Sequence, residues 1–246
     1  MKPIILIPAR MASTRLPGKP LADIEGVPMI VRVWRQAVAA KAGPVVVAAA
    51  EREIAHAVEE AGGRAVLTPP DLPSGSDRVF AALNAVDRGF EHDVVVNLQG
   101  DLPTVDPFVI RACLDALATT GADIATAVAE SDDDDDADNP NVTKAVVTWD
   151  VGGARGNAHY FTRAHAPWGK GPVFVHVGIY AYTREALARF VAMQPSVLEK
   201  REKLEQLRAL EAGMKIGVAR VDAVPLSVDT PADLERARAA VARERA

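Results

Sequence analysis

Three cations and two hydroxyl side chains gather in one short stretch near the N-terminus, between residues 8 and 20. The cations are Arg10, Arg15 and Lys19, and the hydroxyls are Ser13 and Thr14. Guanidinium, ammonium and hydroxyl groups, together with turn backbone N–H groups, are the donors that bind phosphate oxygens. The stretch follows the aliphatic residues 4–7, which are typical of a buried strand, and ligands usually bind at the carboxyl ends of such strands. The sequence therefore predicts a polyphosphate site here.

This stretch matches neither of the two commonest phosphate-binding loops. A Walker A loop needs a glycine five residues before its Gly-Lys pair, where this chain has Ser13, and a Ser or Thr after the pair, where it has Pro20. There is no G-x-G-x-x-G motif either. The alternative is a solvated basic loop, but the spaced prolines hold the stretch in one shape, which favours an anion site.

A carboxylate follows a second predicted strand, at Asp101. The strand covers residues 94–96 and runs into Asn97-Leu98-Gln99-Gly100-Asp101. Asp106 and Pro107 already supply the N-cap and the first residue of the next helix, so Asp101 is not needed as the cap. A hard oxygen ligand at a strand end, opposite phosphate-binding cations, suits a magnesium–triphosphate complex. The alternative is a solvated turn aspartate.

The same reasoning leaves Asp229 without a capping role. Pro231 suits the first position of the last helix, which makes Thr230 its N-cap. Asp101 and Asp229 could share one or two magnesium ions, and the sequence leaves open whether they converge.

The turn-rich segment 69–78 ends at a predicted helix start. Ser76 is the expected N-cap, and helix N-termini can bind anions or ligand carbonyls. A purely structural cap formed by Ser76 and Asp77 is the alternative.

Composition limits the class of protein. The chain has 246 residues, a formal charge of −5 and one cysteine. The negative charge argues against a general nucleic-acid binder. The N-terminal apolar run is too short for a secretory signal, and no apolar run approaches membrane length. We therefore expect a cytoplasmic protein with neither nucleic acid nor membrane as a partner.

Strand and helix patterns alternate along the first half of the chain, which predicts a parallel sheet with helices on its faces. The predicted strands are 4–7, 45–48, 65–68, 94–96 and 122–128. The run from Glu130 to Asp138, with six aspartates, is expected to be a flexible solvated loop, because like charges repel.

The pattern changes after about residue 139. A hairpin is predicted from 143–149 and 158–162, and a further strand from 172–182, so this region adds antiparallel strands. The last predicted elements are a long helix 197–212 ending at Gly213, a strand 216–221 and an extended piece 225–229.

The chain resembles the 3-deoxy-manno-octulosonate cytidylyltransferase (CMP-Kdo synthetase) family over nearly its whole length. The motifs that carry the resemblance are the stretch 8–20, Ser74-Gly75, 97–101, Asn139-Pro140-Asn141, Phe161-Thr162-Arg163, 176–180, 204–208 and 228–234, in family order. The chain departs from the family's usual residues at Leu102 and at Ala49-Ala50.

The resemblance implies an α/β fold of the nucleotide-diphospho-sugar transferase-like Rossmann type. Its mixed, mostly parallel sheet is flanked by helices and carries an antiparallel dimerisation extension. One nucleotidyltransferase domain would span residues 1–246, with about 139–213 forming its sugar-binding and dimerisation part. The implied reaction joins CTP and the acidic sugar Kdo into CMP-Kdo and pyrophosphate for lipopolysaccharide biosynthesis, with Mg²⁺ as cofactor and a homodimer as the working form.

The resemblance also assigns roles to residues. The implied nucleotide-binding residues are Arg10, Ser13, Arg15, Lys19, Ser74 and Arg78. The implied metal ligands are Asp101 and Asp229, which with Arg10 and Lys19 form the catalytic set. The implied sugar-binding residues are Gln99, Arg163, His176, Tyr180, Glu205 and Gln206.

Two alternatives remain. The loop 165–173 is shorter than the family's, which leaves open a cytidylyltransferase for a related acidic or amino sugar. A catalytically silent nucleotide-sugar binding protein is the second alternative, and the two spare aspartates argue against it.

Overall fold

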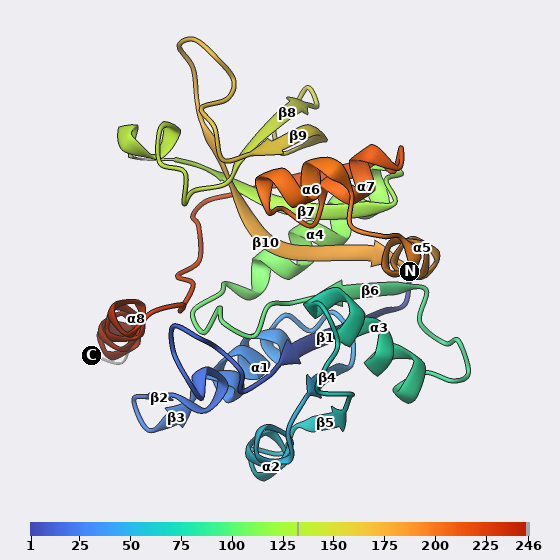
Figure 1. Cartoon of the computed structure of the whole chain (residues 1–246), viewed down its shortest axis with the longest axis vertical. Helices are drawn as coiled ribbons and strands as arrows, with labels where there is room; N and C mark the ends of the chain where they lie inside the picture. Colours follow the sequence, from blue (N-terminus) through green and yellow to red (C-terminus); the bar gives the residue numbers. More distant parts are fainter. Residues whose placement is uncertain (132, 245–246) are drawn as a thin grey trace. The chain divides into compact units, whose positions relative to one another are not determined.

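The computed structural model describes residues 1–131 and 133–244, so Asp132 of the aspartate run lies outside the described residues (Figure 1). The chain forms two compact units, one of Met1–Ile110 with Pro225–Ala246 and one of Arg111–Val224. The segment 139–213 falls inside the second unit, and its roles in sugar binding and dimerisation stay predictions.

The first unit contains a parallel sheet with the strand order β5-β4-β1-β6. The strands are β1 (Pro3–Ala9), β4 (Val45–Ala49), β5 (Arg64–Leu67) and β6 (Val94–Asn97). β1 pairs with β4 on one side and β6 on the other, and its residues 4–7 are at most 2% exposed. These aliphatic residues form a strand because burial on both faces suits a central parallel strand. The four strands predicted in this region are confirmed, with small shifts of their ends.

Helices and short elements connect these strands. They are the 3₁₀ turn η1 (Lys19–Leu21), the small hairpin β2 (Asp23–Ile24) and β3 (Val27–Pro28), and the helices α1 (Met29–Ala39), α2 (Arg52–Glu60) and α3 (Gly75–Val86). Helix α4 (Pro107–Thr120) carries the chain into the second unit. The Asp106 carboxylate accepts a hydrogen bond from Phe108 N at 2.7 Å, as expected for the N-cap that the sequence assigns to Asp106.

The second unit contains a mixed sheet with the strand order β10-β7-β11-β9-β8. The strands are β7 (Ile124–Glu130), β8 (Lys144–Trp149), β9 (Arg155–Thr162), β10 (Phe174–Thr183) and β11 (Ile216–Val221). β7 runs parallel to β11 and antiparallel to β10, and β8 and β9 form the predicted hairpin. The predicted α/β fold with a mixed sheet is confirmed; its parallel pairs lie in the first unit and between β7 and β11.

The prediction of one long helix over 197–212 is wrong. The structure has α6 (Val197–Glu202) and α7 (Leu207–Glu211), after a helix α5 (Arg184–Ala192) that the sequence analysis did not predict. Lys203 adopts a left-handed conformation with φ of 58°, and Leu204 N closes the turn by donating to Glu199 O at 3.3 Å. The break leaves Leu204 and Leu207 buried, at 7% and 0% exposed, so burial outweighs helix continuity here.

One further prediction needs correction. The aspartate run forms a 3₁₀ turn, η2 (Asp134–Ala137), in which the Asp133 carboxylate accepts from Asp135 N at 2.9 Å. Aspartates thus satisfy the backbone locally where an unstructured loop is expected. The predicted extended piece 225–229 has no strand assignment, and its Val228 N donates a hydrogen bond to Asp101 O at 3.0 Å.

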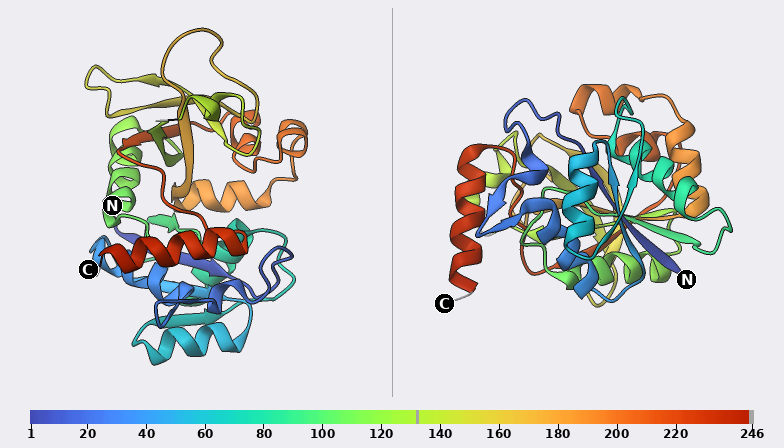
Figure 2. Two further views of the ribbon diagram at one scale, coloured as in Figure 1. Left: turned by 90° about the vertical axis from the view of Figure 1, so that its left-hand side faces the viewer. Right: turned by 90° about the horizontal axis from the view of Figure 1, so that it is seen from below.

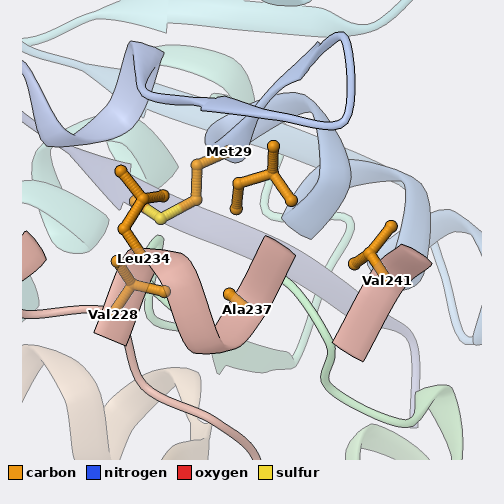
Figure 3. Close-up of a cluster of buried hydrophobic side chains, with 6 residues drawn as sticks. Met29, Val228, Leu234, Ala237 and Val241 are labelled. Carbon is orange, nitrogen blue, oxygen red and sulfur yellow. The ribbon is translucent and has the colours of Figure 1, made fainter. Parts of the chain in front are cut away.

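The last helix, α8 (Pro231–Glu244), returns to the first unit and lies beside the β2–β3 hairpin (Figure 2). Its apolar side packs in a buried cluster with residues from the hairpin and from α1 (Figure 3). The cluster consists of Ile24, Met29, Val228, Leu234, Ala237 and Val241, with Leu16 and Ala22 packed against it. Through Leu16, this cluster therefore joins the stretch 8–20 to the segment that carries Asp229. Among the described helices, none has the length and apolar character that crossing a bilayer requires.

Candidate active site

A cleft of about 380 Å³ opens in the first unit, where β1 and β6 end. Its walls come from the stretch 8–20, the start of α3, the turn after β6 and the segment before α8. It gathers nine of the residues predicted from the sequence, namely Arg10, Ser13, Arg15, Lys19, Ser74, Arg78, Gln99, Asp101 and Asp229. Residues far apart in sequence therefore meet at the carboxyl edge of a parallel sheet, as the fold class predicts.

Lys19 occupies the centre of the charged groups. Its Nζ lies 2.8 Å from Asp101 Oδ2 and 3.1 Å from Asp229 Oδ1, and its side chain is only 16% exposed. Burial by itself lowers the pKa of Lys19, but the Asp101 and Asp229 carboxylates outweigh it, so the pKa is raised overall. The ammonium is therefore charged at neutral pH.

The two spare carboxylates do converge, which the sequence left open. Both contact the Lys19 ammonium, and a guanidinium nitrogen of Arg15 lies 3.3 Å from Asp229 Oδ2. No cluster of three or more metal-ligating side chains occurs in the described part of the chain. Two hard oxygen ligands with open space beside them fit a magnesium ion that takes its other ligands from phosphate and water. The donor set thus fits this metal.

Asp229 is held in place by the start of α8. The Asp233 carboxylate accepts from Asp229 N at 3.1 Å, from Thr230 N at 2.8 Å and from Thr230 Oγ1 at 2.8 Å. Burial raises the pKa of Asp233, but these hydrogen bonds outweigh it and lower the pKa to about 2. Asp233 N in turn donates to Thr230 Oγ1 at 3.3 Å, as expected for the predicted N-cap.

The cationic stretch 8–20 is fixed by contacts that could not be predicted from the sequence. Met11 N donates to Glu51 Oε2 at 2.9 Å, so the first residue before α2 anchors the stretch in place of capping its own helix. Gly18 has a φ of 70°, a conformation that favours glycine. A Cβ on Gly100 would lie 2.8 Å from Pro8 O, so the turn after β6 and the end of β1 pack too closely for a side chain.

Arg78 lines the cleft but directs its guanidinium to the loop after β5. It is 2% exposed and donates to Thr68 Oγ1 at 2.6 Å, Pro69 O at 2.9 Å and Pro70 O at 3.2 Å. Burial lowers the pKa of Arg78 from its ordinary value. Its contacts in this structure hold one wall of the cleft.

The N-cap of α3 is Ser74, and the prediction of Ser76 is wrong by two residues. Ser74 Oγ accepts from Asp77 N at 3.2 Å and lies 2.7 Å from the Asp77 carboxylate, while Ser76 is buried in the first turn. The physical reason is that the Ser74 hydroxyl accepts from Asp77 N and donates to the Asp77 carboxylate. This pair of hydrogen bonds satisfies a free backbone N–H group of the first helical turn. The capping hydroxyl thereby lies in the wall of the cleft.

The second unit brings three of the predicted sugar-binding residues together. The rings of His176 and Tyr180 lie 5.5 Å apart, and burial, Tyr182 and the nearby charge of Glu205 raise the pKa of Tyr180. Burial lowers the pKa of His176 to about 4. At neutral pH this cluster therefore presents a neutral imidazole and a protonated phenol.

Gln206 and Arg163 have different surroundings. The Gln206 side chain is 5% exposed, and its Nε2 has no hydrogen-bond partner among the described residues. Arg163 donates to Glu202 O at 2.9 Å and Pro140 O at 3.0 Å, so its guanidinium is engaged with the protein backbone. Gln99 belongs to the first unit, where its amide donates to Asn97 Oδ1 at 3.1 Å.

Comparisons with known proteins agree on one family. The family model described as Cytidylyltransferase matches residues 4–216. A relative from Parvibaculum lavamentivorans named 3-deoxy-manno-octulosonate cytidylyltransferase is 65% identical, over 98% of this chain and 93% of its own. A relative of the same name from Rhodospirillum centenum is 62% identical, over 96% of this chain and 92% of its own.

A solved structure supports the same assignment. It is described as CMP:2-keto-3-deoxy-manno-octonic acid synthetase complexed with CTP, and it matches 99% of this chain and 100% of its own at 37% identity and a TM-score of 0.91. The chain therefore belongs to the cytidylyltransferase family, and within it to the 3-deoxy-manno-octulosonate cytidylyltransferases.

Proposed function

We propose that this chain joins CTP and Kdo into CMP-Kdo and pyrophosphate, a step of lipopolysaccharide biosynthesis. One observation carries the proposal: in a chain of this family, the cationic stretch 8–20 and the carboxylates of Asp101 and Asp229 meet at a single ammonium, that of Lys19. Cations that can bind phosphate beside carboxylates that can hold Mg²⁺ suit the transfer of a nucleotidyl group from a triphosphate.

The reaction is an in-line displacement at phosphorus. The anomeric hydroxyl of the sugar attacks the α-phosphorus of CTP, the bond to the β,γ-diphosphate breaks and pyrophosphate leaves. Catalysis of this kind depends on positioning and on neutralising charge. Arg10, Arg15 and Lys19 supply the positive charge in the cleft, while Ser13 and Ser74 supply hydroxyl groups.

Asp101 and Asp229 would hold Mg²⁺, and that ion would lower the pKa of the attacking hydroxyl and shield the phosphate charge. The protein contributes the placement of these two carboxylates. Asp229 is fixed through Asp233 and Thr230, and Asp101 accepts a backbone hydrogen bond from Val228. Together with the contacts of both carboxylates to Lys19 Nζ, these hydrogen bonds hold the two side chains in place before nucleotide or metal enters.

The sugar side of the proposal rests on residues of the second unit, and the role of Gln99 in the first unit stays a prediction. Kdo carries one carboxylate and many hydroxyls, so its pocket needs a cation and groups that both donate and accept hydrogen bonds. Arg163 is the cation, and His176, Tyr180, Glu205 and Gln206 are the polar groups. The buried Nε2 of Gln206, which has no hydrogen-bond partner in the described part of the chain, supports a ligand here, because such a donor is costly unless something binds it.

The test is pyrophosphate release by purified protein with CTP, Kdo and Mg²⁺. We expect turnover that is abolished by chelation and reduced at least a hundredfold by Asp101→Asn and by Asp229→Asn, since each removes a metal ligand. Asp222→Asn, at an exposed aspartate outside the cleft, is the matched control and should leave turnover unchanged. Full activity in both cleft variants would exclude the metal mechanism, whatever the sugar.

A silent binding protein and another sugar substrate give different results in the same assay. Protein that binds CTP but releases no pyrophosphate with any sugar acid would be a nucleotide-sugar binding protein. Faster pyrophosphate release with a related acidic or amino sugar would show that this sugar, and not Kdo, is the preferred substrate. A cytoplasmic location is consistent with the proposed use of CTP, and it stays a prediction.

The homodimer is also part of the proposal. Its support in the second unit is the β8–β9 hairpin, whose tip residue Val151 is fully exposed, and the loop residue Trp168, which is 98% exposed. Large apolar side chains exposed on loops are typical of a surface that pairs with a partner. Light scattering at micromolar concentration should give twice the mass of the chain, and a monomer would contradict the proposal.

A further inference from the structure

A fully buried threonine contacts the predicted sugar-binding histidine. Thr126 on β7 is 0% exposed, and its Oγ1 lies 2.9 Å from His176 Nε2 on the neighbouring strand β10. The same oxygen lies 2.8 Å from Ile179 O and 3.1 Å from Val177 O. These two carbonyls belong to the stretch of β10 where the pairing with β7 shifts register. The hydroxyl thus bridges an irregular strand to the histidine ring.

The number of protons around Thr126 Oγ1 decides the state of His176. A hydroxyl has one proton to donate and can also accept, whereas a backbone carbonyl can only accept. If His176 Nε2 carried a lone pair, one proton would have to serve three acceptors. If Nε2 carries the proton, it donates to Oγ1, and Oγ1 donates to the carbonyls. In the first arrangement a hydroxyl proton given to Nε2 would leave both carbonyls facing lone pairs of Oγ1. Only the second arrangement places one proton in the histidine contact and another between Oγ1 and the carbonyls.

The other ring nitrogen is then an acceptor. Burial of the ring lowers the pKa of His176 to about 4, so the imidazole is neutral at pH 7 and holds a single proton. Its Nδ1 makes no hydrogen bond within the described part of the chain. The residue is partly exposed, and its ring packs edge-on against Phe161 with 5.0 Å between centroids, which limits rotation of the ring.

We propose that Thr126 is a positioning residue that fixes His176 as the neutral Nε2–H tautomer, so that Nδ1 accepts a hydrogen bond from a hydroxyl of the bound sugar. The part concerning the sugar rests on the proposed function. The tautomer itself does not, because it follows from contacts within β7 and β10. The consequence for specificity is that this position selects a hydroxyl donor and disfavours a carbonyl or carboxylate oxygen.

The tautomer can be measured without any substrate. In ¹⁵N-labelled protein at pH 7, long-range ¹H–¹⁵N correlation should show the His176 ring with a protonated Nε2 and an unprotonated Nδ1, assigned by comparison with His176→Gln. Adding Kdo and CTP should shift the Nδ1 resonance. A protonated Nδ1, or a doubly protonated ring, would overturn the proposal. An Nδ1 resonance unmoved by saturating Kdo would overturn its ligand part.

Three variants test the role of the hydroxyl. Thr126→Val removes it at similar volume, and we expect loss of the single-tautomer signature and a rise in KM for Kdo of about tenfold, with KM for CTP within twofold. Thr126→Ser keeps the hydroxyl and should restore both. The matched control is Thr148→Val, because Thr148 makes the same contact to the exposed His159 at 2.6 Å.

These variants also separate failure of this proposal from failure of the proposed function. A Thr126→Val protein that keeps the tautomer and the wild-type KM for Kdo would overturn the role of Thr126. If that variant did not fold, the Thr126→Ser variant and the wild-type spectrum would still decide. Wild-type protein that shows the predicted tautomer but no turnover of CTP with Kdo would refute the proposed function and leave the tautomer standing.

Discussion

Single side chains set the charge balance of the cleft. Lys19 lies between two carboxylates at 2.8 and 3.1 Å, and without it these carboxylates would repel each other and the triphosphate. The ammonium therefore ties the two carboxylates together, and in the proposed function it is also a charge that binds phosphate. Its raised pKa keeps it positive through the physiological range.

Replacing this ammonium should remove most of the activity. For Lys19→Met we expect kcat/KM for CTP to fall by about a hundredfold or more, the usual effect of removing one preorganised charge at a transition state. Lys215→Met, at an exposed lysine outside the cleft, is the control and should behave as wild type. Steady-state kinetics with equal protein concentrations decides, and a Lys19→Met enzyme within threefold of wild type would rule out this role of Lys19.

At the scale of elements, the start of α8 determines where Asp229 lies. Asp233 accepts three hydrogen bonds from Asp229 and Thr230, and the buried cluster around Leu234 holds the helix against α1 and the β2–β3 hairpin (Figure 3). Loss of the cap would therefore affect both stability and the position of Asp229, the proposed metal ligand.

The pH dependence of this cap has a definite sign. The pKa of Asp233 falls from an ordinary 3.8 to about 2 on folding, so its contribution is complete above about pH 4 and is lost as the pH falls towards 2. Asp233→Ala should cost about 1 kcal/mol at pH 7, which is roughly 2–4 °C in Tm. In thermal unfolding, the difference in Tm between Asp233→Ala and wild type should shrink as the pH falls from 4 to 2. A Tm difference that does not depend on pH would contradict this role of Asp233, and the control variant Asp222→Ala should have the Tm of wild type.

The contact between the turn after β6 and β1 is a second element-scale constraint. Gly100→Ala would place a Cβ 2.8 Å from Pro8 O, which has to move the stretch 8–20 or the turn. We expect a loss of about 1–3 kcal/mol in the free energy of unfolding and weaker CTP binding. Gly152→Ala is the control, because its nearest neighbour lies 3.7 Å away. Chemical denaturation and calorimetric titration measure the two effects, and equal behaviour of the two variants would refute the constraint.

Much of the fold can be predicted from local sequence patterns. The strand ends that bear Asp101 and the cap at Thr230 follow from hydrophobic runs and proline positions, which act over a few residues. The break in the helix at Lys203 could not be predicted from the sequence, because the helical pattern continues through this residue. Burial of Leu204 determines that the helix ends there. The anchoring of Met11 by Glu51 was also missed, since that contact spans 40 residues and Glu51 reads as part of a helix start.

At the scale of the whole molecule, the cleft depends on the chain leaving the first unit and coming back. The chain departs in α4 and returns at Pro225, so Lys19 and Asp229 meet although they are 210 positions apart. Their convergence needs the return of the chain, which is why the sequence left it open. The net charge of −5 likewise says little of the cleft, where cations are concentrated locally.

The sugar substrate is the central claim, and the ratio of kcat/KM values for different sugar acids tests it most directly. CTP and Mg²⁺ would be kept saturating while Kdo, a sialic acid and an amino sugar acid are compared by pyrophosphate release and by mass spectrometry of the product. We predict CMP-Kdo as the product and a kcat/KM for Kdo at least a hundredfold above the others. A higher value for another sugar acid, or no CMP-Kdo from active protein, would contradict the account.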